Sequence, residues 1–239
     1  MYRCFHKKNV LITGGTKGIG NAIANLFYNE GANVNITGTA NKANKFKKFN
    51  YIKCNFLEEN EFNTFLINIK DLKIDILVNN AGINIINEFQ NIKSSEFLNL
   101  HRVNTYSPFK ICQSVLPNMK KKKWGRIINI SSIWGKISKE HRASYSSSKF
   151  GLDGITASLA AEVAKDCILV NSVSPGFIET ELTNKILGHS GIKKMSSLVP
   201  MKRLGKPEEI AKLVIWLSSS ENTYVSGQNI LIDGGFNRV

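Results

Sequence analysis

Short apolar runs alternate with longer amphipathic segments along the whole chain. Five segments with apolar residues at helical spacing predict helices at residues 18–29, 59–69, 94–119, 144–165 and 207–219. Seven runs, most of them continuously apolar, predict buried strands at residues 9–13, 33–37, 51–54, 74–79, 126–131, 168–173 and 229–232. This alternation is typical of a parallel sheet that helices cover on both faces. We therefore expect an α/β fold, a doubly wound seven-stranded parallel sheet of the Rossmann type, in one domain spanning residues 1–239.

The segment 179–204 departs from this alternation. It has no strand pattern, and it contains Gly188, Gly191 and Pro200. Irregular segments of this length beside a ligand site often close over it. We expect a short helical lid over the carboxyl edge of the sheet.

The composition is that of a globular protein that stays where it is made. Hydrophobic residues make up 42% of the 239 residues and charged residues 21%. The first apolar run is too short for a signal peptide, and no run is long enough for a membrane helix. The four cysteines lack metal-ligand spacing with the four histidines. We expect a cytoplasmic protein with no membrane partner and no metal.

The net charge of +14 raises the question of a nucleic-acid partner. The lysines are spread along the chain among asparagine and isoleucine instead of gathering in one stretch. This distribution favours a solvated basic surface over a nucleic-acid site. A modest attraction for anionic substrates or acidic carrier proteins stays open.

A glycine-rich turn follows the first predicted strand and precedes the first predicted helix. In that position backbone N–H groups and the positive end of the helix dipole can bind a pyrophosphate. The spacing is G-x-x-x-G-x-G, and a merely structural tight turn is the alternative for the motif taken alone. The predicted phosphate contacts are Gly14, Thr16, Lys17, Gly18, Ile19 and Gly20.

The residues after the second predicted strand indicate which dinucleotide fits. NAD-binding proteins of this type place an acidic side chain there to hold the ribose hydroxyls. The stretch 38–42 has no acid, and Lys17 together with Thr39 or Lys42 can meet a 2′-phosphate. The sequence therefore predicts NADP(H).

A serine, a tyrosine and a lysine form the candidate proton-handling group. Ser132 follows the fifth predicted strand, where ligands bind in such sheets. Tyr145 and Lys149 lie one turn apart on the same face of the next helix. A nearby ammonium favours the phenolate, so we expect Lys149 to lower the pKa of Tyr145. A chance pair on a helix is the alternative.

Several motifs follow one another along the chain: Thr13-Gly14-x-x-x-Gly18-Ile19-Gly20, Asn79-Asn80-Ala81-Gly82, Ser132 with Tyr145-x-x-x-Lys149, and Pro175-Gly176. In order and spacing they resemble the short-chain dehydrogenase/reductase family, and within it most closely the 3-oxoacyl-[acyl-carrier-protein] reductases of fatty acid synthesis. The resemblance covers essentially the whole chain. It implies a homotetramer that reduces a ketone to a secondary alcohol with NADPH.

The resemblance also implies roles for individual residues. Tyr145 is the acid and base, Ser132 orients the carbonyl, Lys149 binds the nicotinamide ribose, and Asn104 completes the catalytic group by holding a water. The further cofactor contacts that it implies are Asn55, Phe56, Asn79, Ala81, Gly82, Pro175, Gly176, Ile178 and Thr180.

Three functions are compatible with the sequence. The first is reduction of a 3-oxoacyl thioester, with the basic residues 120–123 and Arg126 beside the cleft to hold an acidic carrier. A solvated helix end is the alternative for those residues, and Asp166 stands where the resemblance leads us to expect an arginine. The second is the same chemistry on a sugar, polyol or other small ketone, which Trp134 and the lid would decide. The third is a dinucleotide-binding protein without catalysis.

Overall fold

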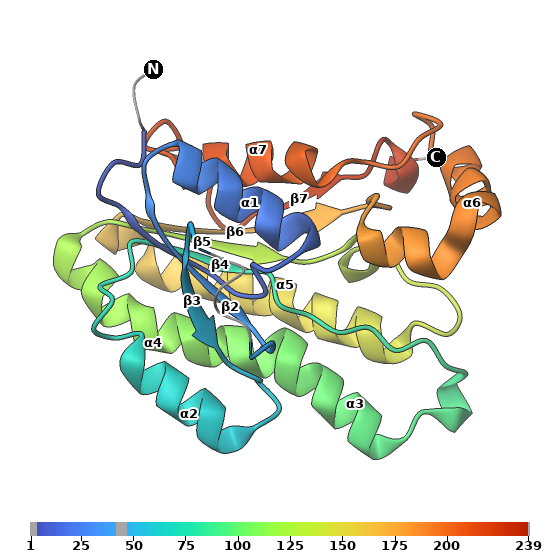
Figure 1. Cartoon of the computed structure of the whole chain (residues 1–239), viewed down its shortest axis with the longest axis horizontal. Helices are drawn as coiled ribbons and strands as arrows, with labels where there is room; N and C mark the ends of the chain where they lie inside the picture. Colours follow the sequence, from blue (N-terminus) through green and yellow to red (C-terminus); the bar gives the residue numbers. More distant parts are fainter. Residues whose placement is uncertain (1–3, 42–46, 239) are drawn as a thin grey trace.

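The computed structural model describes residues 4–41 and 47–238 and contains the predicted sheet (Figure 1). Seven strands pair in parallel in the order β3-β2-β1-β4-β5-β6-β7. The predicted strands are confirmed, with ends that differ by at most two residues. The strands are β1 Asn9–Ile12, β2 Asn33–Gly38, β3 Asn50–Lys53, β4 Ile76–Asn79, β5 Gly125–Ile130, β6 Ile168–Pro175 and β7 Asn229–Ile232.

Helices cover both faces of the sheet, as Figure 1 shows. α1 (Gly18–Asn29) and α7 (Pro207–Ser218) pack together on one face, and α2 (Glu59–Asn68), α4 (Ser107–Lys122) and α5 (Ala143–Val163) cover the other. Alternate residues of β1 divide between the two layers: Val10 and Ile12 pack under α1 and α7, and Leu11 packs under the other helices. The apolar runs of the central strands β1, β4 and β5 are nearly continuous because both faces of these strands are buried.

The predicted helix at 94–119 is interrupted. α3 (Ser94–His101) leads into a π-helical turn, η3 (Arg102–Tyr106), before α4 begins. Pro108 has no N–H to donate to the carbonyl of Asn104, so the α-helical bonding pattern fails at this point. The wider bonding of the π turn, in which the N–H of Ser107 donates to the carbonyl of Arg102, takes its place. The sequence reasoning missed this break, which falls on a candidate catalytic residue.

The segment after β6 is helical over most of its length. Thr180 precedes α6 (Glu181–Leu198), and its hydroxyl caps the helix by accepting from the N–H of Thr183 at 3.1 Å. Gly188 has φ 59° and ψ −176°, so the helix is kinked there. No helix in residues 4–41 and 47–238 is both long and apolar enough to cross a bilayer.

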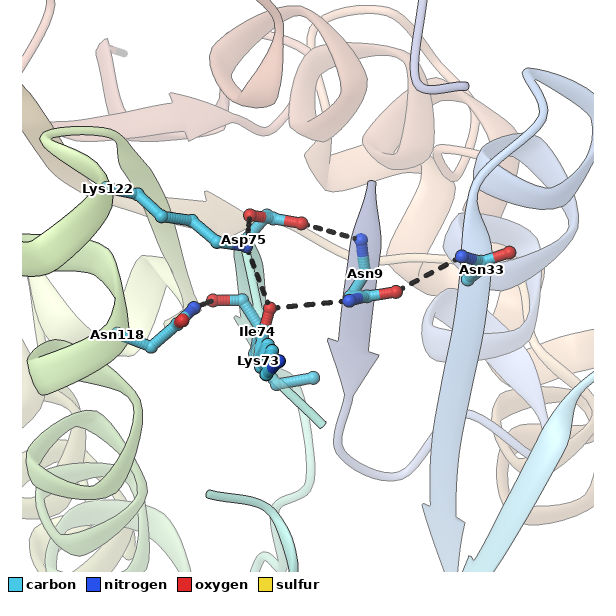
Figure 2. A network of polar contacts seen from close by, with 7 residues as sticks. All are labelled: Asn9, Asn33, Lys73, Ile74, Asp75, Asn118 and Lys122. Carbon is cyan, nitrogen blue, oxygen red and sulfur yellow. Dashed lines mark hydrogen bonds and ion pairs between the residues drawn. The ribbon is translucent and has the colours of Figure 1, made fainter. Parts of the chain in front are cut away.

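A polar network closes the amino edge of the sheet (Figure 2). The buried carboxylate of Asp75 accepts from the backbone N–H of Asn9 at 2.9 Å and from the ammonium of Lys122 at 2.6 Å. Asn118 donates to the carbonyl of Ile74 at 3.1 Å. The network joins the start of β1, the segment before β4 and the end of α4. It fixes this edge of the sheet and leaves the carboxyl edge for ligands.

Candidate active site

The turn after β1 is built for close approach of a ligand to the backbone. Gly14 and Gly18 have φ of +65° and +54°, values that side chains disfavour. A Cβ on Gly20 would lie 2.4 Å from the carbonyl oxygen of Gly14, so only glycine fits there. Lys17 is exposed and precedes the first residue of α1. These features fit a pyrophosphate held by backbone N–H groups at the helix N-terminus.

Asn80 supports this turn, and the sequence reasoning did not single it out. Its amide nitrogen donates to the carbonyls of Thr13 and Gly14, each at 3.0 Å. The hydroxyl of Thr13 accepts in return from the N–H groups of Asn80 and Ala81. The side chain of Asn79 instead lies buried in the sheet and donates to Asn129 at 2.8 Å. Asn79 therefore connects two strands within the sheet, whereas Asn80 supports the turn.

The predicted adenine contacts follow β3, and their side chains contact nearby residues of the chain. Asn55 accepts from the N–H of Leu57 at 3.1 Å. Phe56 is buried with Phe62 in the core beneath α2. Thr39 is exposed after β2, whereas Lys42, the alternative contact for a 2′-phosphate, lies outside the described residues.

Ser132 and Tyr145 meet at the carboxyl end of β5. Ser132 follows that strand, and its hydroxyl accepts from the backbone N–H of Trp134 at 3.2 Å. Tyr145 lies in the first turn of α5, and a hydrogen bond joins its hydroxyl to Ser132. The side chain of Tyr145 is only partly buried, so the pair can reach a substrate. Two hydroxyls in contact can hold one carbonyl oxygen between them.

Lys149 lies one turn further along α5 and is almost fully buried. Its ammonium donates to the carbonyl of Ile130 at 2.8 Å. Burial lowers the pKa of Lys149 to about 8. A Cβ on Gly82 would lie 3.7 Å from this nitrogen and 3.3 Å from the amide oxygen of Asn104. The structure therefore brings Gly82, Asn104 and Lys149 together.

The expected lowering of the pKa of Tyr145 by Lys149 is wrong for this structure. Burial raises the pKa of Tyr145, and the hydrogen bond to Ser132 and the charge of Arg142 only partly offset the increase. The nitrogen of Lys149 lies 5.7 Å from the centre of the tyrosine ring and is bonded to Ile130. The cation whose charge acts on the phenol is Arg142, three residues before the tyrosine, which the sequence reasoning did not consider.

Asn104 fixes the loop after β4. Its amide oxygen accepts from the N–H of Ile83 at 2.9 Å, and its amide nitrogen donates to the carbonyl of Ile83 at 2.9 Å. The same nitrogen donates to the hydroxyl of Ser148 at 3.1 Å. Asn104 thus joins the π turn, the loop beyond Gly82 and α5. The role implied for it, holding a water, stays a prediction.

The end of β6 brings the last predicted residues to the same edge. Gly176 follows Pro175 and donates to the carbonyl of Ile232 at 3.0 Å. Ile178 is buried. The methyl group of Thr180 lies 3.5 Å from the position of a Cβ on Gly18, so the start of α6 meets the phosphate-binding turn.

The basic residues expected beside the cleft are elsewhere. Lys120, Lys121 and Lys122 form the last turn of α4, next to the amino end of β5 and not to its carboxyl end. Lys123 forms an ion pair with Asp166. Arg126 is buried and donates to the carbonyls of Gly125 and Asn222. These cations lie at the amino edge of the sheet, whereas Ser132 lies at the carboxyl edge. The positions therefore favour the alternative interpretation of residues 120–123, a helix end stabilised by its dipole.

Three features together define the class of protein. They are a doubly wound sheet, a turn suited to binding a dinucleotide, and a Ser-Tyr-Lys group at the carboxyl edge of the sheet. A family model described as enoyl-(acyl carrier protein) reductase matches residues 14–237. The chain belongs to the short-chain dehydrogenase/reductase family.

Individual relatives cover nearly the whole chain. The chain is 40% identical over 239 residues to the 3-oxoacyl-[acyl-carrier-protein] reductase FabG of Buchnera aphidicola subsp. Schizaphis graminum, with 96% of this chain and 97% of the relative covered. ElxO with NADP bound is similar in structure, with a TM-score of 0.90, 32% identity and coverage of 96% and 98%. A tyrosine-to-phenylalanine variant of ElxO has been solved with NADPH bound. A putative gluconate dehydrogenase from Agrobacterium tumefaciens has a TM-score of 0.92 at 27% identity, with coverage of 100% and 99%.

Proposed function

We propose that the protein reduces the ketone of a 3-oxoacyl thioester to a secondary alcohol with NADPH. The observation that carries this proposal is the contact between Ser132 and Tyr145 at the edge where the glycine turn lies. The curated relative in Buchnera is a 3-oxoacyl-[acyl-carrier-protein] reductase, which supports the choice of substrate.

In this mechanism the two hydroxyls hold the substrate oxygen. Ser132 donates a hydrogen bond to the carbonyl oxygen, and Tyr145 donates its proton to the same oxygen as the alcohol forms. Bound NADPH supplies the hydride that the carbonyl carbon receives. Lys149, next to Gly82, would hold the ribose of the cofactor with its ammonium. The other proposed cofactor contacts are the residues named above at the ends of β1, β2, β3, β4 and β6.

The assay that tests this function compares two kinds of ketone. We expect NADPH-dependent reduction of an acetoacetyl thioester and weaker or no reduction of a panel of keto-sugars. The putative gluconate dehydrogenase among the structural relatives favours the second candidate, a sugar or polyol substrate. Activity on keto-sugars alone would replace the first candidate by the second. NADPH binding without turnover of either kind would favour a non-catalytic dinucleotide-binding protein.

Lys17 provides a test of the cofactor preference. Its exposed ammonium at the start of α1 is free to approach a 2′-phosphate, which NADH lacks. We expect Lys17→Ala to weaken NADPH binding by about tenfold, the effect of one charge-assisted contact, and to leave NADH binding almost unchanged. Fluorescence titration with both nucleotides measures this. Tighter binding of NADH than of NADPH by the unaltered protein would contradict the proposal.

We further propose that residues 1–239 form one dinucleotide-binding domain, with the substrate lid at 179–204, in a cytoplasmic homotetramer. The kink at Gly188 gives the lid a point at which to bend. Exposed aromatic side chains on the π turn, α4 and α5 support association through this side of the molecule; they are Tyr106, Phe109 and Phe150. A sedimentation mass equal to one chain would contradict the tetramer.

A further inference from the structure

The guanidinium of Arg142 lies beside the reacting tyrosine without an acceptor. Arg142 precedes α5 and is half-buried. Its Nε atom is enclosed and has no hydrogen-bond partner. No hydrogen bond or ion pair joins the side chain to any other residue that the structure describes. The two Nη groups are not enclosed in this way, so their N–H donors can reach an acceptor from outside the chain.

The guanidinium of Arg142 lies over an aromatic cluster that begins two residues after Ser132. The guanidinium carbon lies 5.5 Å from the centre of the Trp134 ring. The backbone N–H of Trp134 donates to the hydroxyl of Ser132, which places Trp134 next to the reacting pair. The Trp134 ring meets those of Phe177 and Phe236 edge-on, at 6.4 and 6.5 Å. A substrate held by Tyr145 would therefore meet a fork of cationic donors with an apolar surface beside it.

This arrangement fits a substrate with a second oxygen close to the ketone. The 3-oxoacyl thioester of the proposed function has such an oxygen, since its thioester carbonyl is separated from the ketone by one methylene group. We infer that Arg142 orients the substrate by donating to the thioester carbonyl oxygen, while Ser132 and Tyr145 hold the ketone oxygen. The inference rests on the proposed function. It makes Arg142 the residue that distinguishes 1,3-dicarbonyl substrates from simple ketones.

A ratio of rates tests this role directly. The substrates are the N-acetylcysteamine thioester of acetoacetate and cyclohexanone, which has no second carbonyl. We expect Arg142→Met to lower the ratio of their kcat/KM values by about 10 to 100-fold, the effect of losing a hydrogen bond to a charged donor. Arg142 also acts electrostatically on Tyr145, but that effect reaches both substrates and cancels in the ratio.

Lys139→Met is the matched control. Its ammonium lies 5.7 Å from the same Trp134 ring, yet the side chain is exposed and has no place in the proposed site. We expect the ratio for Lys139→Met to stay within about twofold of the unaltered protein, as is usual for surface substitutions. Arg142→Gln, which keeps donors but loses the charge, gives a second variant if the methionine variant fails to bind NADPH.

Binding provides a readout that does not depend on the slow substrate. Calorimetry on the NADPH-loaded protein, in which the alcohol has no hydride acceptor, should show about tenfold weaker binding of the 3-hydroxybutyryl thioester by Arg142→Met. An unchanged ratio and unchanged binding would overturn the role of Arg142, and so would an equal loss on both ketones. Absence of thioester reduction by the unaltered protein is a different outcome, because it would refute the proposed function itself.

Discussion

Tyr145→Phe is expected to lower kcat by about 10² to 10⁴-fold, the usual contribution of a general acid or base. The substitution removes only the hydroxyl that joins Ser132 and would protonate the alkoxide. The ring remains, so the packing at the start of α5 should persist. NADPH affinity should change by less than about threefold, because the turn after β1 is untouched.

The measurement is a steady-state assay with the acetoacetyl thioester, paired with a fluorescence titration of NADPH. Tyr51→Phe is the matched control, since that hydroxyl donates to the carbonyl of Ala40, beyond the end of β2. Near-normal turnover by Tyr145→Phe would remove the tyrosine from the mechanism.

The central strands were predictable because nearly all of their residues are buried. Val10, Leu11 and Ile12 are fully buried on alternating faces, and a short apolar run records this directly in the sequence. The break between α3 and α4 was harder to predict. Pro108 signalled it, but a proline also suits the first turn of a helix, and only the structure shows that a π turn precedes it.

The members of the candidate site were predictable by position, whereas their electrostatics were not. Tyr145 and Lys149 share a helix face because they are four residues apart on one helix. The direction in which the ammonium of Lys149 points depends instead on the carbonyl of Ile130, which lies nineteen residues earlier in a strand. The expectation that residues 120–123 lie beside the cleft was wrong for the same reason. Residues 120–123 are close to Ser132 in sequence, but β5 separates them and carries the chain across the sheet.

Asn80 and Arg142 were missed for a related reason. Both lie within or beside motifs that were examined, yet their importance comes from contacts with distant backbone and rings. Asn80 reaches the carbonyls of Thr13 and Gly14, and Arg142 lies over Trp134. An isolated sequence contains no signal for such pairs. Elements and motifs are therefore predictable from this sequence, whereas residues that act through long-range contacts are not.

The burial of Lys149 leads to the second large effect, which concerns stability. A pKa lowered from 10.5 to about 8 means that the fold disfavours the charged amine, at a cost of roughly 3 kcal/mol when the lysine is protonated. For a base with a lowered folded pKa, this cost is fully present below pH 8. It disappears as the pH rises toward 10.5, because the unfolded chain binds the extra proton in that window.

Lys149→Met should therefore be inactive but more stable than the unaltered protein at pH 7. We expect a gain of about 1 to 3 kcal/mol in the free energy of unfolding, since the lost hydrogen bond to Ile130 offsets about 1 kcal/mol. Urea unfolding without cofactor, repeated between pH 7 and 10, measures the difference between the two proteins. That difference should shrink as the pH rises above 8, whereas the exposed Lys139→Met should show no such trend. A less stable Lys149→Met at pH 7, with a difference independent of pH, would mean that the buried amine is held as a well-satisfied cation. In that case the fold would be built around its charge, and the lysine would stabilise the site that it serves.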